Sequence, residues 1–146
     1  MMRIARATTA VLQKAGVEFG ILGEAENCCG ESIRKTGDEE LFKRLARENI
    51  KAFIDHGVKR ILVNSPHCYH TFKNEYPEFR VDFEVVHISE LLLELIDGGK
   101  LTLLALQAQI GNPDAAGDVA DLLLRIPQRP VLLIALALGG AQGLVQ

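Results

Sequence analysis

Hydrophobic and polar positions along the first 100 residues fall into blocks with two different periods. Apolar side chains recur with helical spacing in four blocks, which predict helices over about residues 3–15, 39–56, 66–76 and 89–97. Short apolar runs between these blocks predict strands over residues 17–22, 60–64 and 83–88. Strands that alternate with helices pair in parallel, so we expect a layered α/β fold in which helices flank a short parallel sheet.

Capping and breaking residues predict where the helices begin and end. Three hydroxyl residues are expected to cap helix N-termini, namely Thr36 (in a capping box with Glu39), Ser65 and Ser89. Gly57 and Pro77 are expected to end two of the helices. The apolar side chains of the helices are expected to face the core. They are Ile4, Ala7, Val11, Leu12, Leu41, Phe42, Leu45, Ala46, Ile50, Phe53, Ile54, Leu91, Leu92, Leu95 and Ile96.

The chain changes in composition near Leu101. All aromatic residues, all 4 histidines and 30 of the 35 charged residues lie in residues 1–100. We therefore expect a domain over residues 1–100 and an apolar tail over residues 101–146. Within the tail the pattern predicts a turn at 111–114, a helix over 115–126 and a buried strand or helix over 131–138.

Composition and charge exclude several classes of protein. The 146 residues give room for one ordinary domain. A net charge of −3 leaves no excess of Lys and Arg to neutralise phosphates, so we expect no nucleic acid partner. The longest apolar run, over 131–138, is far shorter than the about 20 residues of a membrane span. We find no signal peptide, and 3 cysteines make no disulfide framework, so we expect a cytoplasmic protein.

The three cysteines lie in loops where the ligand sites of parallel sheets gather. Cys28 and Cys29 follow the first predicted strand and Cys68 follows the second, and the carboxyl ends of parallel strands share one edge. Cys68 would be the third residue of a helix capped by Ser65, so the helix dipole and free backbone N–H groups are expected to lower its pKa. Such a thiolate suits a metal ligand or a nucleophile. A buried structural thiol is the alternative.

Cys28 and Cys29 are unsuited to a disulfide with each other, because neighbouring cysteines make a strained one. Gly30 permits a sharp turn that points both thiolates into one site, and soft thiolates favour zinc, Cu(I) or an iron–sulfur cluster. Two unrelated cysteines are the alternative. A zinc site that adds His67 or His70 is a further hypothesis, although histidines at a helix start are more often polar surface residues.

Two segments of the sequence together carry a family pattern. The first is Glu26-Asn27-Cys28-Cys29-Gly30-Glu31, followed by Arg34-Lys35-Thr36-Gly37. The second is Ser65-Pro66-His67-Cys68, which leads to Lys73-Asn74-Glu75-Tyr76-Pro77. Over residues 3–100 the chain resembles the cysteine-rich CCG domain of iron–sulfur proteins related to heterodisulfide reductase, among them subunits of glycolate oxidase and lactate-utilisation systems. The resemblance implies a partial Rossmann-like fold.

The resemblance also implies a cofactor and a class of reaction. It implies a four-iron four-sulfur (4Fe-4S) cluster with Cys28, Cys29 and Cys68 as ligands, in a loop shaped by Asn27 and Gly30. It implies electron transfer in an oxidoreductase of the heterodisulfide-reducing or 2-hydroxy-acid-oxidising kind, with flavoprotein or other iron–sulfur subunits as partners. Association with a membrane would come only through such a complex, and this chain alone is not expected to be an active enzyme.

The chain departs from the family pattern at three points. The family has a further cysteine well before the CCG segment, whereas none precedes Cys28 here. It often has Cys-Pro-x-Cys where this chain has Ser65-Pro66-His67-Cys68, and it continues into a second such domain, which residues 101–146 do not match. Three thiolates are one short of the four that usually hold a cubane cluster. A non-functional truncated or frameshifted fragment of such a protein is therefore the alternative hypothesis.

Overall fold

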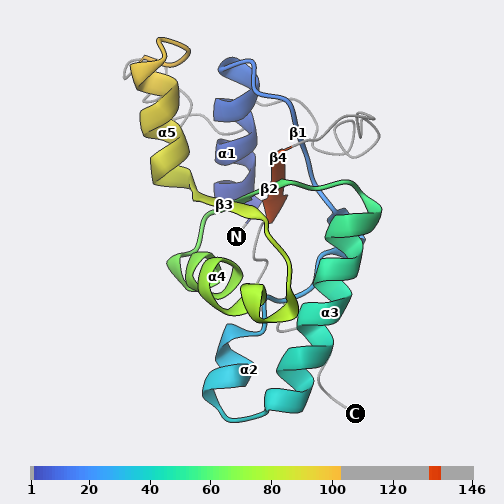
Figure 1. The fold of residues 1–146 in the computed structure, drawn as a ribbon. Helices are drawn as coiled ribbons and strands as arrows, with labels where there is room; N and C mark the ends of the chain where they lie inside the picture. The colour runs from blue at the N-terminus through green and yellow to red at the C-terminus, as the bar shows by residue number, and fades with distance from the viewer. Residues whose placement is uncertain (1, 103–131, 136–146) are drawn as a thin grey trace.

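The structure is a computed structural model that describes residues 2–102 and 132–135 (Figure 1). The α-helices in this part of the chain are α1 (Met2–Lys14), α2 (Glu31–Lys35), α3 (Glu39–Asp55), α4 (Pro66–His70) and α5 (Ile88–Asp97). The strands are β1 (Phe19–Gly20), β2 (Arg60–Val63), β3 (Glu84–His87) and β4 (Leu132–Ala135). Three short turns are η1 (Gly23–Ala25), the π-helical η2 (Thr71–Glu75) and η3 (Tyr76–Phe79).

All strand pairs in the described sheet are parallel, in the order β1-β4-β2-β3, which confirms the predicted α/β class. β1 has only two residues, so the strand predicted over 17–22 is much shorter than expected. β4 confirms a strand within the apolar run 131–138, and it pairs between β1 and β2 (Figure 1). The turn predicted at 111–114 and the helix predicted over 115–126 lie outside the described residues, and the division at residue 100 stays a prediction.

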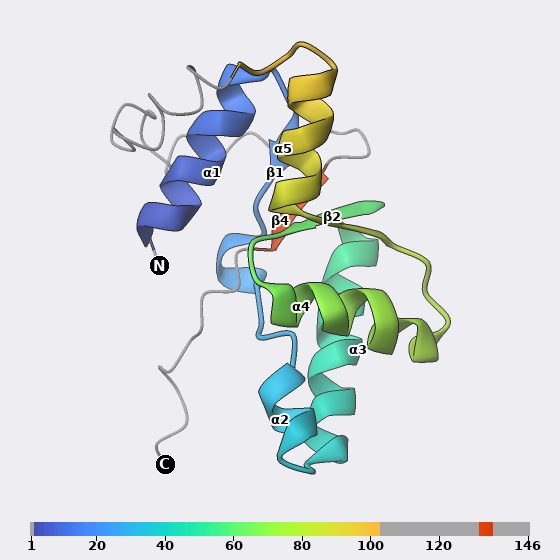
Figure 2. The ribbon, with the colours of Figure 1, turned by 90° about the vertical axis from the view of Figure 1, so that its left-hand side faces the viewer.

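Helices cover both faces of the sheet, so the fold has three layers (Figures 1 and 2). On one face Ile61 and Val63 of β2 pack in a cluster with the buried side chains of α3 and of the run from α4 to η3. On the other face Leu62 packs with the buried side chains of α1 and α5. The continuous apolar run of β2 is therefore explained by burial on both faces. Among the helices that the structure describes, none has the length and apolar character to span a membrane.

Two positions predicted to face the core are instead on the surface. Ile4 and Ile54 are each 61% exposed. The inner side of α3 is set by Phe42, Ala46 and Phe53, and Ile54 lies one step of about 100° around the helix from Phe53. Ile4 lies in the first turn of α1, ahead of the residues that meet the sheet.

The predicted capping box at Thr36 is wrong, because Thr36 belongs to the preceding helix. α2 was not predicted, and Thr36 closes it, with its hydroxyl donating to the carbonyl of Ile33 at 2.8 Å. Gly37 then turns the chain at φ = +93°. The N-cap of α3 is Asp38, whose Oδ1 accepts from the amide of Leu41 at 3.0 Å.

The predicted cap of α5 is also wrong, by two residues. His87 occupies the N-cap, and its Nδ1 accepts from the amide of Ser89 at 3.4 Å. Glu90 Oε2 accepts from the amide of His87 at 2.9 Å, which completes a capping box. A histidine can take this role because a neutral imidazole nitrogen is a hydrogen-bond acceptor.

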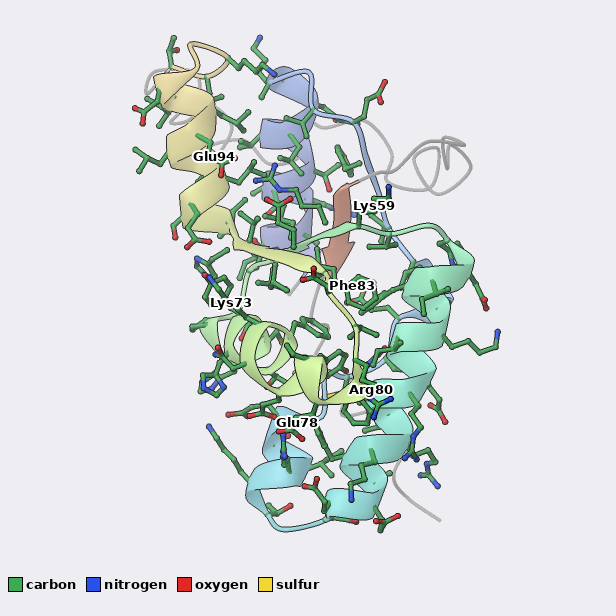
Figure 3. All side chains as sticks on the ribbon, viewed as in Figure 1. Lys59, Lys73, Glu78, Arg80, Phe83 and Glu94 are labelled. Atoms are coloured by element: carbon green, nitrogen blue, oxygen red, sulfur yellow. The ribbon has the colours of Figure 1, made fainter. Side chains whose placement is uncertain are left out.

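The helix predicted to stop at Pro77 continues to Phe79. Pro77 lies in the first turn of η3, where its missing N–H would have no partner in any case. The chain then ends the helical run at Arg80, with φ = +61°. Phe83 extends from the segment beyond it towards α3, where its ring lies 5.5 Å from that of Phe53 (Figure 3).

Candidate functional site

The three cysteines converge beside the carboxyl end of β2. Cys28 and Cys29 lie in the loop between η1 and α2, and Cys68 is the third residue of α4. Cys29 Sγ lies 3.4 Å from Cys68 Sγ. Cys29 and Cys68 are buried, whereas Cys28 is exposed, and all three are free thiols. The structure thus brings together the three residues that the sequence singled out.

The three thiols are linked by successive hydrogen bonds, from Cys28 through Cys29 to Cys68. The contact with Cys29 and then burial raise the pKa of Cys28 above its usual range. The contact with Cys28 acts to lower the pKa of Cys29, but its hydrogen bond to Cys68 and its burial outweigh this and raise the pKa to about 11. The bond that Cys68 accepts from Cys29 lowers the pKa of Cys68, and burial only partly opposes it. Cys68 is therefore the thiol that ionises first.

The pKa of Cys68 is lowered, as predicted, and two side-chain hydrogen bonds contribute to the shift. The hydrogen bond from the Cys29 thiol lowers it most, and the hydrogen bond from the Ser65 hydroxyl adds to this. Ser65 occupies the predicted N-cap position of α4, but its side chain makes no capping hydrogen bond. Its hydroxyl hydrogen-bonds the Cys68 thiol instead. Glu26 adds a carboxyl group to these surroundings, and burial raises the pKa of Glu26 to about 8.

The conformation of the cysteine loop depends on Gly30. This residue has φ = +88°, and a Cβ atom there would lie 2.8 Å from Cδ2 of Phe42. The amide of Gly30 donates to Cys28 Sγ at 3.4 Å. Glycine is therefore required both for the backbone angle and for the close packing of the loop on α3. Asn27, the other residue expected to shape the loop, is exposed.

Two buried polar side chains hold the backbone of the cysteine pair from inside the protein. Asn49 Nδ2 donates to the carbonyl of Cys28 at 2.9 Å and to the hydroxyl of Tyr76 at 3.0 Å. The Tyr76 hydroxyl in turn donates to the carbonyl of Cys29 at 3.2 Å. Sequence reasoning missed Asn49. Its signal is a polar residue on the apolar side of α3, where it is only 1% exposed.

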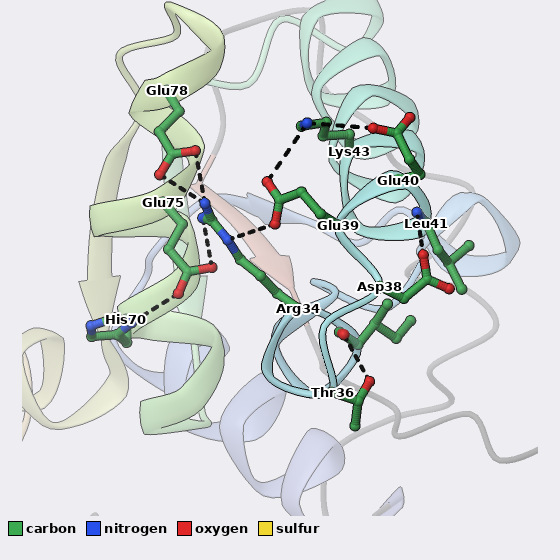
Figure 4. Close-up of polar contacts among 11 residues, drawn as sticks. Arg34, Thr36, Asp38, Glu39, Glu40, Leu41, Lys43, His70, Glu75 and Glu78 are labelled. Atoms are coloured by element: carbon green, nitrogen blue, oxygen red, sulfur yellow. Dashed lines mark hydrogen bonds and ion pairs between the residues drawn. The ribbon is translucent and has the colours of Figure 1, made fainter.

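An arginine ties the helix after the cysteine loop to the rest of the domain. Arg34 of α2 pairs with three carboxylates, those of Glu39, Glu75 and Glu78, at 3.2, 3.4 and 3.0 Å (Figure 4). Its guanidinium also lies 4.6 Å from the centre of the Phe42 ring. Glu78 comes from the η3 turn close to α2 (Figure 3). The loop is therefore anchored at its C-terminal end.

The two histidines that were considered as zinc ligands each lie beside a carboxylate. His67 Nδ1 lies 3.1 Å from Glu31 Oε1, and His70 Nδ1 lies 3.5 Å from Glu75 Oε1. Both histidine side chains are more than 60% exposed, at 69% and 62%. Within the described residues, no group of three or more His, Cys, Asp or Glu side chains is arranged to hold a metal ion as it stands.

The donor set fits a sulfur-ligated cluster in kind but is one short in number. Cys29 contacts both Cys28 and Cys68, and thiolates are the ligands of iron–sulfur clusters. A cubane cluster takes four thiolates, and the described residues supply three, with the Ser65 hydroxyl beside Cys68.

Known proteins share the region that contains this site. Residues 2–73 match the family described as CCG, a cysteine-rich domain. The chain is 46% identical over 99 residues to the EtfAB:quinone oxidoreductase of Syntrophomonas wolfei and, over the same length, to the probable iron-sulfur-binding oxidoreductase FadF of Bacillus subtilis. It is 35% identical over 106 residues to a component of the dihydromethanophenazine:CoB--CoM heterodisulfide reductase of Methanosarcina barkeri.

The shared region is a small part of these relatives. Each alignment covers 68% of this chain, but 14% of the first two proteins and 26% of the third. No solved structure gives a significant match. The chain therefore has iron–sulfur oxidoreductase components among its homologues, and it corresponds to one part of each.

Proposed function

Residues 2–73 of this chain are a cysteine-rich domain of the CCG family, and from this premise we propose that the chain binds an iron–sulfur cluster through Cys28, Cys29 and Cys68. The observation that carries the proposal is the convergence of all three thiols at one edge of the sheet, with 3.4 Å between Cys29 Sγ and Cys68 Sγ. Burial of two of these thiols supports it further, because a cluster partly shielded from water is better retained.

We propose that the cluster is of the 4Fe-4S type. Cys28, Cys29 and Cys68 would hold three of the irons, and the fourth would take a ligand from outside the described residues. When bound, the cluster supplies one-electron transfer. The chain's own residues bind it, limit the access of water and orient the ligand loop.

The wider role rests on the activities for which the relatives are named and is likewise a proposal. We propose that the chain is an electron-transfer component of an oxidoreductase complex, with flavoprotein or other iron–sulfur subunits as partners. A heterodisulfide and a 2-hydroxy acid are the candidate substrates of such a complex. Membrane association through a partner remains a prediction.

Anaerobic reconstitution tests cluster binding directly. The chain is incubated with iron and sulfide, desalted, and analysed for both elements and by electron paramagnetic resonance. We expect about four irons and four sulfides per chain. Cys68→Ala should lose most of this iron, whereas His67→Ala, which changes an exposed residue paired with Glu31, should keep it.

Three results would contradict the proposal in different ways. Iron close to zero in the reconstituted chain would overturn cluster binding. One zinc per chain without iron, lost in both Cys68→Ala and His67→Ala, would support the zinc hypothesis instead. A stable complement of two irons would overturn the 4Fe-4S assignment but leave the cysteine site standing.

A further inference from the structure

We infer that Asn49 and Tyr76 are positioning residues that hold the two carbonyls of the cysteine pair towards the core, and that the Tyr76 bond thereby turns the Gly30 amide N–H towards Cys28 Sγ. The inference rests on the proposed cluster, and it assigns a role to two residues whose side chains contact the backbone of the cysteine pair. Three features of the structure carry it: the contacts of each carbonyl, the burial of the two side chains and their coupling to the sulfurs.

The carbonyl groups of Cys28 and Cys29 need hydrogen-bond donors from outside their own loop. Neither residue is in a helix or strand, so their carbonyls take no part in a regular hydrogen-bond ladder. Buried carbonyls without a donor are costly, and here each has one. Asn49 Nδ2 donates to the carbonyl of Cys28 at 2.9 Å, and the Tyr76 hydroxyl donates to that of Cys29 at 3.2 Å.

Three hydrogen bonds connect Asn49, Tyr76 and the two carbonyls into a relay. One N–H of the Asn49 amide goes to Cys28, and its Nδ2 also donates to the Tyr76 hydroxyl at 3.0 Å, so the tyrosine proton is left for Cys29. Tyr76 is fully buried, and its ring stands edge-on to Phe72 at 4.8 Å. A buried amide and phenol are costly to desolvate, and these hydrogen bonds offset part of that cost.

The Tyr76 bond is coupled to a sulfur through a single peptide group. The carbonyl of Cys29 and the amide of Gly30 belong to the same peptide plane and point in opposite directions. Fixing the carbonyl on Tyr76 therefore aims the Gly30 amide at Cys28 Sγ, 3.4 Å away. The next amide, that of Glu31, likewise bonds the Cys29 sulfur. N–H···S hydrogen bonds stabilise the added electron of a cluster and so raise its reduction potential.

Tyr76→Phe removes only the hydroxyl and tests the inference. Tyr69→Phe is the matched control, because the Tyr69 hydroxyl donates to Glu90 and not to the cysteine loop. In the reconstituted chain we expect Tyr76→Phe to have a lower midpoint potential than wild type and to hold iron about tenfold more weakly. Tyr69→Phe should match wild type in both measurements.

A second readout uses the iron-free chain, so that it does not depend on the cluster. Iodoacetamide labelling is followed by peptide mass spectrometry, with circular dichroism to confirm that each variant is folded. We expect Cys29 to be labelled faster in Tyr76→Phe and in Asn49→Leu than in wild type. Equal potentials and equal labelling rates in folded Tyr76→Phe and wild type would overturn the inference. Failure of the wild-type chain to bind iron would overturn only the proposed function, and the labelling rates would still decide the positioning role.

Discussion

The thiol sulfurs of Cys29 and Cys68 lie 3.4 Å apart although the two residues are 39 positions apart in the chain. Cys29 is in the loop before α2 and Cys68 is in the first turn of α4, directly after β2. No local motif spans that separation. Their contact therefore forms only when the strands and helices between them are folded. A disulfide between the two residues would thus indicate that the native arrangement is present.

Mild oxidation of the iron-free chain should link Cys29 to Cys68. Their sulfurs need only a small approach to reach the about 2.05 Å of a disulfide, whereas adjacent cysteines form a strained bond. We expect this link to dominate after treatment with diamide, as mapped by mass spectrometry of unreduced peptides. Cys28→Ser should keep the link and Cys29→Ser should lose it. A dominant link between Cys28 and Cys68 would contradict the described loop.

The sequence was sufficient to predict that the three cysteines would lie at the same edge of the sheet, because that prediction needs only the parallel direction of the strands. β2 is a continuous apolar run, so it had to be covered on both faces and to pair in parallel. A loop that leaves the carboxyl end of such a strand lies at the same edge as its neighbours. Cys68 and the Cys28–Cys29 pair followed from this rule without any knowledge of side-chain contacts.

The helix N-caps and the hydrogen bonds of Asn49 and Tyr76 could not be predicted in the same way. The caps depend on which of several neighbouring residues ends one helix and begins the next, and the hydrogen bonds depend on residues distant in the sequence. Thr36 and Asp38 are both good caps, and the choice depends on a helix ending at Lys35, which periodicity over five residues cannot detect. Asn49 showed only as a polar residue among apolar ones. Its partners Cys28 and Tyr76 are 21 and 27 residues away, so only the folded chain reveals them.

Gly30→Ala should destabilise the iron-free chain by about 2–4 kcal/mol, the sum of a left-handed backbone angle and an overlap with a buried ring. Its φ is +88°, and the new Cβ would lie 2.8 Å from Phe42 Cδ2. Gly37→Ala is the matched control, because Gly37 has φ = +93° and nothing within 4 Å of its Cβ position. Urea unfolding should show a loss of only about 1–2 kcal/mol there. Equal losses of unfolding free energy in the two variants would mean that the overlap with Phe42 does not contribute to the destabilisation.

Arg34→Met should lower the free energy of unfolding by about 1 kcal/mol in low salt, because it leaves three carboxylates without their shared cation. Lys51→Met, which breaks only the exposed pair with Asp55 on α3, should change stability less. Urea unfolding in low and high salt measures both variants. Since salt screens exposed charges, the Arg34 effect should shrink at high salt, and an effect that grew with salt would count against the ion-pair explanation.

Ser65→Cys should increase iron retention in the reconstituted chain, because it adds a fourth thiol beside the existing three. The Ser65 hydroxyl already hydrogen-bonds the Cys68 thiol, so a sulfur at that position would share the site. Ser65→Ala is the control for loss of the hydroxyl alone, and we expect it to bind no more iron than wild type. Iron and sulfide per chain after challenge with a chelator provide the measurement. If Ser65→Cys loses iron as fast as Ser65→Ala, a thiol at position 65 does not reach the cluster, and the prediction is wrong.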